Sequence, residues 1–295
     1  MNVPSEAEVQ SYLANSNWGR WGADDQRGAI NLITPEKRIA AAGLVRSGRS
    51  VSLARPFPKT PAPNNLNPAQ HFMRVNPTGV AVDYYGISYH GTASTHLDAL
   101  CHMWDANGLW NGASPDVVTT DGAGWGSIDH WSTGVTTRGV LLDVERHRGT
   151  YVTQDTPVHG GELEEIAKAQ GVTMQPGDAL IVNCGREAYE RAVGPWGANP
   201  AERPGMHASC LPFIRGADAS ILIWDMLDLL PSGYSVFRGI HPVLWRYGVG
   251  LVDNAQLDRL SAACAEEGRY EFMLTMAPLV VMGGTGSPIN PLAIF

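Results

Sequence analysis

The hydrophobic positions of this 295-residue chain fall into short runs separated by polar, helix-like segments. Residues 177–185 (GDALIVNCG) and 219–225 (ASILIWD) are nearly continuous apolar runs, as is typical of strands that a sheet buries on both faces. Residues 50–57, 138–145 and 277–286 are shorter runs rich in branched residues, and they also predict strands. The chain therefore carries at least five candidate strands spread along its length.

Helices are predicted between these strands by amphipathic segments that have recognisable ends. Residues 34–48 combine Thr34 as N-cap and Pro35 at the first helical position with a glycine at the far end. Residues 161–171 and 255–268 have the same apolar spacing and also end in glycine. Alternating helices and strands, without a repeat or a change of composition, predict one α/β domain over residues 1–295 with a mixed sheet.

Three stretches interrupt this alternation with proline, glycine, asparagine or tryptophan and no clear period. They are residues 58–70, 121–134 and 186–208. We interpret them as surface loops, some of which form a site.

Composition narrows the class of partner. The chain is 44% hydrophobic, carries a formal net charge of -8 and has no run of lysine or arginine. This argues against nucleic acid or an anionic membrane surface as the partner and favours a small-molecule substrate. The first residues show no basic segment followed by an apolar one, and no apolar stretch is long enough to span a bilayer, so we expect a cytoplasmic protein. The four scattered cysteines are expected to be free thiols.

The chemistry concentrates in residues 89–108 (YHGTASTHLDALCHMWDANG), which hold His90, His96, Asp98 and His102. On an extended segment His96 and Asp98 project to the same side, which makes them a ready pair of ligands. Imidazole with carboxylate suits zinc, manganese or iron(II) better than calcium or magnesium. If the chain turns after Ala99, His102 returns over the same site.

A second pair, His241 and Asp253, lies far downstream. By spacing alone this pair is weak evidence, because a structural histidine and an aspartate capping the next helix would give the same pattern. Its meaning depends on whether the fold brings it to the first cluster.

Together these segments resemble the cyclase-like family of metal-dependent hydrolases, which includes bacterial kynurenine formamidase and isatin hydrolase. The resemblance runs along nearly the whole chain, through residues 21–57, 95–102, 177–185, 204–214, 239–254 and 277–291. The family pattern is H-x-x-x-H-x-D-x-x-x-H. His96, Asp98 and His102 match its last three positions, whereas Thr92 stands where the first histidine is expected.

The resemblance implies a swivelling β/β/α architecture and a ligand set in which two positions depart from the family. Metal ligands would be His96 and Asp98, with His90 either replacing the ligand missing at Thr92 or contacting the other side chains or the substrate. His241 and Asp253 resemble the ligands of a second metal position, with aspartate in place of the usual glutamate. The ion count, one or two, stays open on the sequence.

The resemblance also implies hydrolysis of a carbonyl bond in an aryl formamide, a cyclic amide or a lactone. A divalent Mn²⁺ or Zn²⁺ ion polarises the carbonyl and lowers the pKa of water. His102 is the expected proton shuttle, with His207 or His241 next in line. Trp104 and Trp110 follow the motif and, with His207, are expected to contact the substrate.

Other classes of function have weaker support in the sequence. The departures at Thr92 and Asp253 leave open a non-catalytic small-molecule-binding protein on a degenerate hydrolase scaffold. The glycines of residues 283–288 have no helix after them to meet a dinucleotide, and no G-x-S-x-G supports a serine hydrolase. We also expect a homo-oligomer, a dimer or a tetramer, in which the apolar tail 289–295 packs on a partner chain.

Overall fold

Four parallel strands form the middle of one nine-stranded mixed sheet in the computed structural model, which describes residues 3–295. They are β7 (Val135–Asp143), β8 (Ala179–Asn183), β9 (Ile221–Trp224) and β10 (Gly250–Asp253), each hydrogen-bonded to the next. Antiparallel strands flank them on both sides: β4 (His96–Asp98) and β12 (Gly286–Pro288) beyond β10, and β11 (Glu271–Met276), β13 (Leu292–Ile294) and β1 (Ser50–Ser52) beyond β7. The predicted α/β class with a mixed sheet is confirmed.

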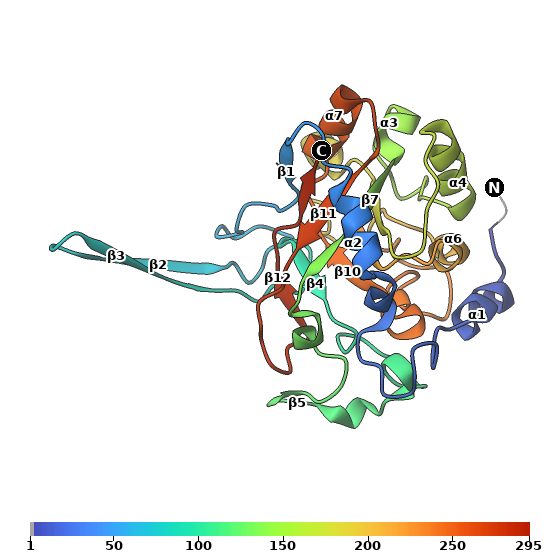
Figure 1. Cartoon of the computed structure of the whole chain (residues 1–295), viewed down its shortest axis with the longest axis horizontal. Coiled ribbons are helices and arrows are strands. Elements are labelled where there is room, and N and C mark those ends of the chain that lie inside the picture. The colour runs from blue at the N-terminus through green and yellow to red at the C-terminus, as the bar shows by residue number, and fades with distance from the viewer. Residues whose placement is uncertain (1–2) are drawn as a thin grey trace.

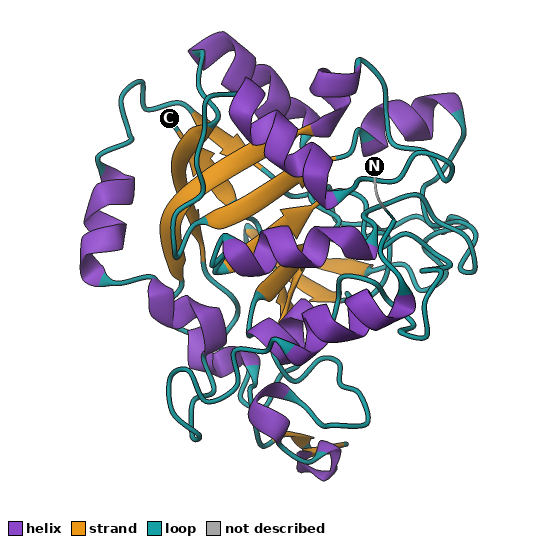
Figure 2. Cartoon of the chain, turned by 90° about the vertical axis from the view of Figure 1, so that its right-hand side faces the viewer, coloured by secondary structure: helices purple, strands orange, loops and turns teal. Residues whose placement is uncertain are grey.

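Helices pack around this sheet, as Figure 2 shows. The α-helices are α1 (Glu6–Ala14), α2 (Pro35–Ala42), α3 (Val144–Arg148), α4 (Gly160–Ala169), α5 (Arg186–Ala192), α6 (Leu211–Gly216) and α7 (Asp258–Glu267). Short 3-10 helices span Gly28–Leu32, Trp110–Gly112, Pro115–Val117, Ile128–Trp131 and Ala208–Cys210, and a π-helix spans Val243–Tyr247. Within residues 3–295, no helix has the length and apolar character that crossing a membrane requires.

The predicted helix ends are largely right. The Thr34 hydroxyl accepts a hydrogen bond from the Lys37 amide at 3.2 Å, and Pro35 opens α2 as expected. The helix ends at Ala42, with Gly43 as its C-cap, rather than at Gly48, and Ile39 is exposed while Ala41 is buried.

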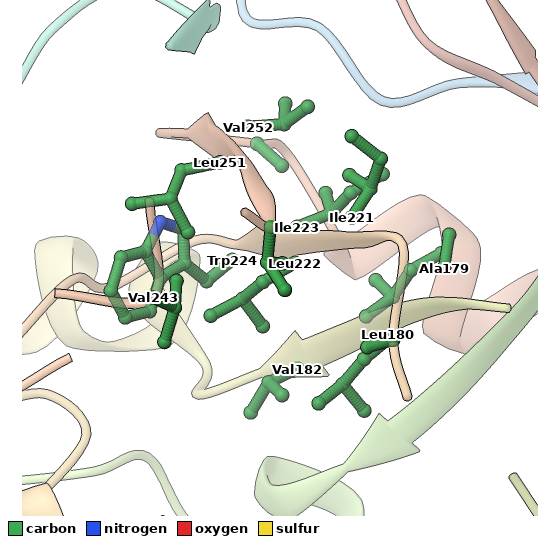
Figure 3. Packing of buried hydrophobic residues seen from close by; sticks show 14 of the residues in the cluster. Ala179, Leu180, Val182, Ile221, Leu222, Ile223, Trp224, Val243, Leu251 and Val252 are labelled. Atoms are coloured by element: carbon green, nitrogen blue, oxygen red, sulfur yellow. The ribbon is translucent and has the colours of Figure 1, made fainter. Parts of the chain in front are cut away.

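The core is centred on the parallel strands. Every residue of β8 and β9 is buried, as the continuous apolar runs predict. Figure 3 shows their aliphatic side chains packed with those of β10. Strands β9 and β10 are therefore held rigidly, and the residues at their carboxyl ends have fixed positions.

Two predictions about the C-terminal region are wrong. Residues Leu279–Met282 lie in an exposed loop rather than a strand, and the strand that forms there is the short β12. The tail packs within its own chain, because β13 pairs with β1 on one side and β11 on the other and Phe295 is fully buried. The burial of residues 289–295 alternates with period two, as in a paired strand.

A long hairpin was not predicted. Strands β2 (Gln70–Asn76) and β3 (Val80–Gly86) pair with each other and with no other strand of the described residues. Figure 1 shows this hairpin projecting away from the rest of the molecule. A second, very small hairpin pairs β5 (Val118–Thr119) with β6 (Gly122–Ala123).

Candidate metal centre

Strand pairing brings together three of the predicted ligand residues. His96 and Asp98 are two apart on β4 and so share a face of the sheet, as the spacing predicts. In the antiparallel register of β4 and β10, Asp253 lies directly opposite His96. His96, Asp98 and Asp253 each offer a ligand atom within 4.8 Å of the others, and all three are buried.

His96 presents its Nε2 atom to the two carboxylates. Its Nδ1 donates to the Ser94 carbonyl at 2.8 Å, which fixes the ring and the tautomer. Nε2 lies 3.3 Å from Asp98 Oδ1 and 4.0 Å from Asp253 Oδ2. Burial alone lowers the pKa of His96, but Asp98 and Asp253 outweigh it and raise the pKa to about 9.

His241 approaches the same place from the segment before the π-helix. Its Nδ1 contacts Asp228 Oδ2 at short range, and its Nε2 lies 3.6 Å from Asp253 Oδ2. Asp228 is itself held by the backbone amides of Ile240 and His241. Burial opposes the charged ring, yet Asp228 and Asp253 raise the pKa of His241 to about 9.

Asp253 is a member of this cluster and not a helix cap. Its Oδ1 accepts a hydrogen bond from the Trp224 indole at 2.5 Å, while Oδ2 faces the two histidines. Helix α7 begins only at Asp258, too far along the chain for Asp253 to cap it. The capping alternative is therefore excluded.

These donor atoms fit a divalent metal ion. Both carboxylate oxygens of Asp98 are buried and find no hydrogen-bond partner within residues 3–295. The Nδ1 atom of each ring has another partner, so the Nε2 atom of His96 faces Asp98 and Asp253, and the Nε2 atom of His241 faces Asp253. Two imidazole nitrogens and two carboxylates form a donor set that suits zinc or manganese.

His90 and His102 also lie beside Asp98. Their rings stack with centroids 3.9 Å apart and planes 3° apart. His90 Nδ1 is 2.9 Å from Asp98 Oδ1, and His102 Nε2 is 3.9 Å from Asp98 Oδ2. These three residues form a second group able to hold an ion. A turn in which the His102 amide donates to the Ala99 carbonyl returns His102 to the site.

Thr92 does not join the cluster. Its hydroxyl donates to the Asn64 carbonyl at 3.0 Å, on the wall of a cavity of about 260 Å³ that His90 also lines.

Burial lowers the pKa of His102 to about 4 despite the nearby carboxylate of Asp98, so this ring is neutral at pH 7.

The three residues expected to contact substrate are scattered. Trp104 is 42% exposed close to the motif, whereas Trp110 is fully buried, with its indole donating to the Asp25 carbonyl. His207 lies in a separate group, hydrogen-bonded to Ser209 and Tyr234. Burial and the neighbouring His159 lower the pKa of His207 to about 4.

Two residues of the candidate metal centre were not predicted from the sequence. Asp228 orients His241, and Trp224 orients Asp253. Both belong to residues 224–228, at and just beyond the carboxyl end of the buried strand β9, where ligands commonly gather in α/β sheets.

Comparison with known proteins identifies the family. The Cyclase family model, described as "Putative cyclase", matches residues 50–229, which is more than half of the chain. The chain belongs to this family, which confirms the resemblance inferred from sequence. No curated protein matches it.

Solved structures agree with that assignment. A crystal structure of a novel cyclase is 29% identical, with a TM-score of 0.86 over 96% of this chain and 99% of that one. An isatin hydrolase bound to the product analogue thioisatinate is 15% identical, with a TM-score of 0.60 over 88% and 98%. Isatin hydrolase A from Labrenzia aggregata is 18% identical, with a TM-score of 0.59 over 86% and 94%. At these identities the isatin hydrolases show a shared fold.

Proposed function

We propose that this protein is a metal-dependent hydrolase that attacks a carbonyl bond of a small molecule. The observation that carries the proposal is the group of buried donor atoms from His96, Asp98 and Asp253, with His241 next to Asp253 and the neutral ring of His102 nearby. Burying two carboxylates with two imidazoles is costly unless a cation is shared between them. A divalent ion removes that cost.

A Mn²⁺ or Zn²⁺ ion would be held by His96, Asp98, Asp253 and His241. His90, whose Nδ1 lies 2.9 Å from Asp98 Oδ1, is the candidate for a further ligand. When bound, such an ion polarises a carbonyl and makes water acidic enough to react near neutral pH. Asp228 and the Ser94 carbonyl keep the two imidazoles oriented toward the ion.

His102 is the proposed proton-transfer group. A backbone carbonyl fixes the ring of His96, and Asp228 fixes the ring of His241. The side chain of His102 is 23% exposed, so it can reach a reacting molecule. A neutral ring at pH 7 accepts a proton from water and then delivers it to the leaving nitrogen or oxygen. Asp98 faces the ring and stabilises the imidazolium that forms.

The substrate class we propose is an aryl formamide, a cyclic amide or a lactone. The isatin hydrolases support this choice, because isatin is a cyclic amide and those proteins share this fold. Trp104, exposed beside the motif, is the proposed contact for a flat ring.

The testing experiment is a hydrolysis screen on protein loaded with Mn²⁺ or with Zn²⁺. Formanilide, isatin and an aryl lactone represent the three bond types. Turnover of at least one of them that disappears in His102→Ala supports the hydrolase. Binding without turnover, unchanged in His102→Ala, would instead support the non-catalytic binding protein.

A further inference from the structure

Arg203 is a buried cation with no anion beside it. The residue is 5% exposed, and its Nε and Nη2 atoms are buried without a hydrogen-bond partner in residues 3–295. No carboxylate of this described region lies within 4.0 Å of its guanidinium. An unpaired buried charge is expensive, so a position of this kind is expected to serve a ligand.

The guanidinium is held in place by an aromatic ring. Its Cζ lies 5.4 Å from the centroid of Trp196, a fully buried residue whose indole donates to the Pro204 carbonyl. The Cζ atom of Arg186 lies 4.7 Å from the centroid of the same ring. The cation–π contact orients Arg203 but satisfies none of its N–H donors.

Arg203 faces the candidate metal centre. It lines the same cavity of about 260 Å³ as His90 and Thr92. It is also close enough to Asp228 and Asp253 for their charges to act on it, and Arg238 lies nearby. Arg203 therefore borders the same space as His90, beside the place that a molecule bound at the metal centre would occupy.

The charge of the surrounding groups also favours an anion. The carboxylates of Asp98, Asp228 and Asp253 contribute three negative charges. The guanidinium groups of Arg203 and Arg238, together with a divalent ion, contribute four positive ones. With neutral imidazoles, the loaded site keeps an excess positive charge, which an anionic molecule would balance.

We propose that Arg203 binds a carboxylate of the substrate, and that the substrates are therefore carboxylate-bearing amides or esters rather than neutral ones. This inference rests on the proposed function of the same site. A guanidinium presents parallel N–H groups that match the two oxygens of a carboxylate, which gives both energy and orientation.

A binding measurement tests the role of Arg203 without requiring turnover. Benzoate is titrated calorimetrically into zinc-loaded wild type, Arg203→Met, Arg203→Lys and the exposed control Arg46→Met. We expect Arg203→Met to weaken benzoate at least about tenfold, Arg203→Lys to weaken it less, and Arg46→Met to match wild type. The ion is common to all four proteins, so the difference reports the side chain. Benzoate affinity unchanged in Arg203→Met would overturn the proposal.

A matched pair of substrates then separates specificity from catalysis. For 2-formamidobenzoate, kcat/KM should fall about tenfold or more in Arg203→Met, whereas formanilide, which lacks the carboxylate, should be unaffected. If wild type hydrolyses neither compound, the proposed hydrolase is at fault while the benzoate titration still decides the role of Arg203. A purely structural role would lower the Tm of Arg203→Met. We expect no loss, since the substitution removes an unpaired buried charge.

Discussion

The imidazole rings of His90 and His102 lie face to face, 3.9 Å apart, and both point at the carboxylate of Asp98. Two stacked imidazolium ions would repel each other, which opposes a positive charge on both rings at once. His90 is hydrogen-bonded to Thr285 through Nε2, whereas burial keeps His102 neutral at pH 7. In the proposed function His90 would support the metal centre, and His102 would be available for proton transfer.

Replacing His102 is expected to abolish turnover while leaving the metal bound. His102→Ala should retain the wild-type metal content and lose at least about a hundredfold in kcat, because proton transfer typically contributes that much. Steady-state kinetics on the best substrate of the screen, with His147→Ala as an exposed control, measure the effect. Near wild-type kcat in His102→Ala would move the role to another group.

Substitutions of His90 and Thr92 are expected to differ in their effect on metal affinity. His90→Ala should weaken metal binding, because His90 contacts Asp98 at 2.9 Å. Thr92→Val should leave metal affinity unchanged, because the Thr92 hydroxyl donates to Asn64 instead. Competition with a chromogenic chelator compares the two variants. Equal affinities for His90→Ala and wild type would restrict His90 to the substrate cavity.

Asp228 is expected to act on the metal through His241. Asp228→Asn keeps the shape but removes the negative charge behind the imidazole, so metal Kd should rise about 10- to 100-fold. Asp155→Asn, at an exposed turn, is the matched control. The same chelator competition measures both, and an unchanged Kd for Asp228→Asn would show that His241 does not ligate.

Metal binding should release protons at pH 7. In the metal-free protein the carboxylates raise the pKa of His96 and of His241 to about 9, so both rings are protonated at pH 7. Because a metal ion binds neutral imidazole, each ion should displace about two protons, and affinity should rise with pH until about pH 9. Calorimetric titrations in buffers of different ionisation enthalpy give the proton count directly. A count of zero would mean that these rings are not ligands.

Much of the scaffold follows from the sequence because its strands are long, apolar and buried. The runs around β8 and β9, the N-cap of α2 and the glycine that follows α4 have strong local signals. The hairpin β2–β3 and the loop Leu279–Met282 have none that decides their place, because exposed apolar residues look the same in sequence as buried ones.

The centre itself is predictable in part. The spacing of His96 and Asp98 places both on one face of a strand, which the β4 register confirms. The approach of His241 and Asp253 depends on the pairing of β4 with β10, which joins residues more than 150 positions apart and has no local signature. Asp228 and Arg203 act through contacts that only the folded chain creates, so no spacing rule points to them.

The most direct test of the account is the metal content of protein purified without chelator, measured by elemental analysis for wild type, His96→Ala and Asp98→Ala. We expect about one manganese or zinc ion per chain in wild type and a loss in both variants. Two ions per chain would assign the His90, Asp98 and His102 group as a second position. Wild type that contains no metal and takes up neither zinc nor manganese would contradict the account.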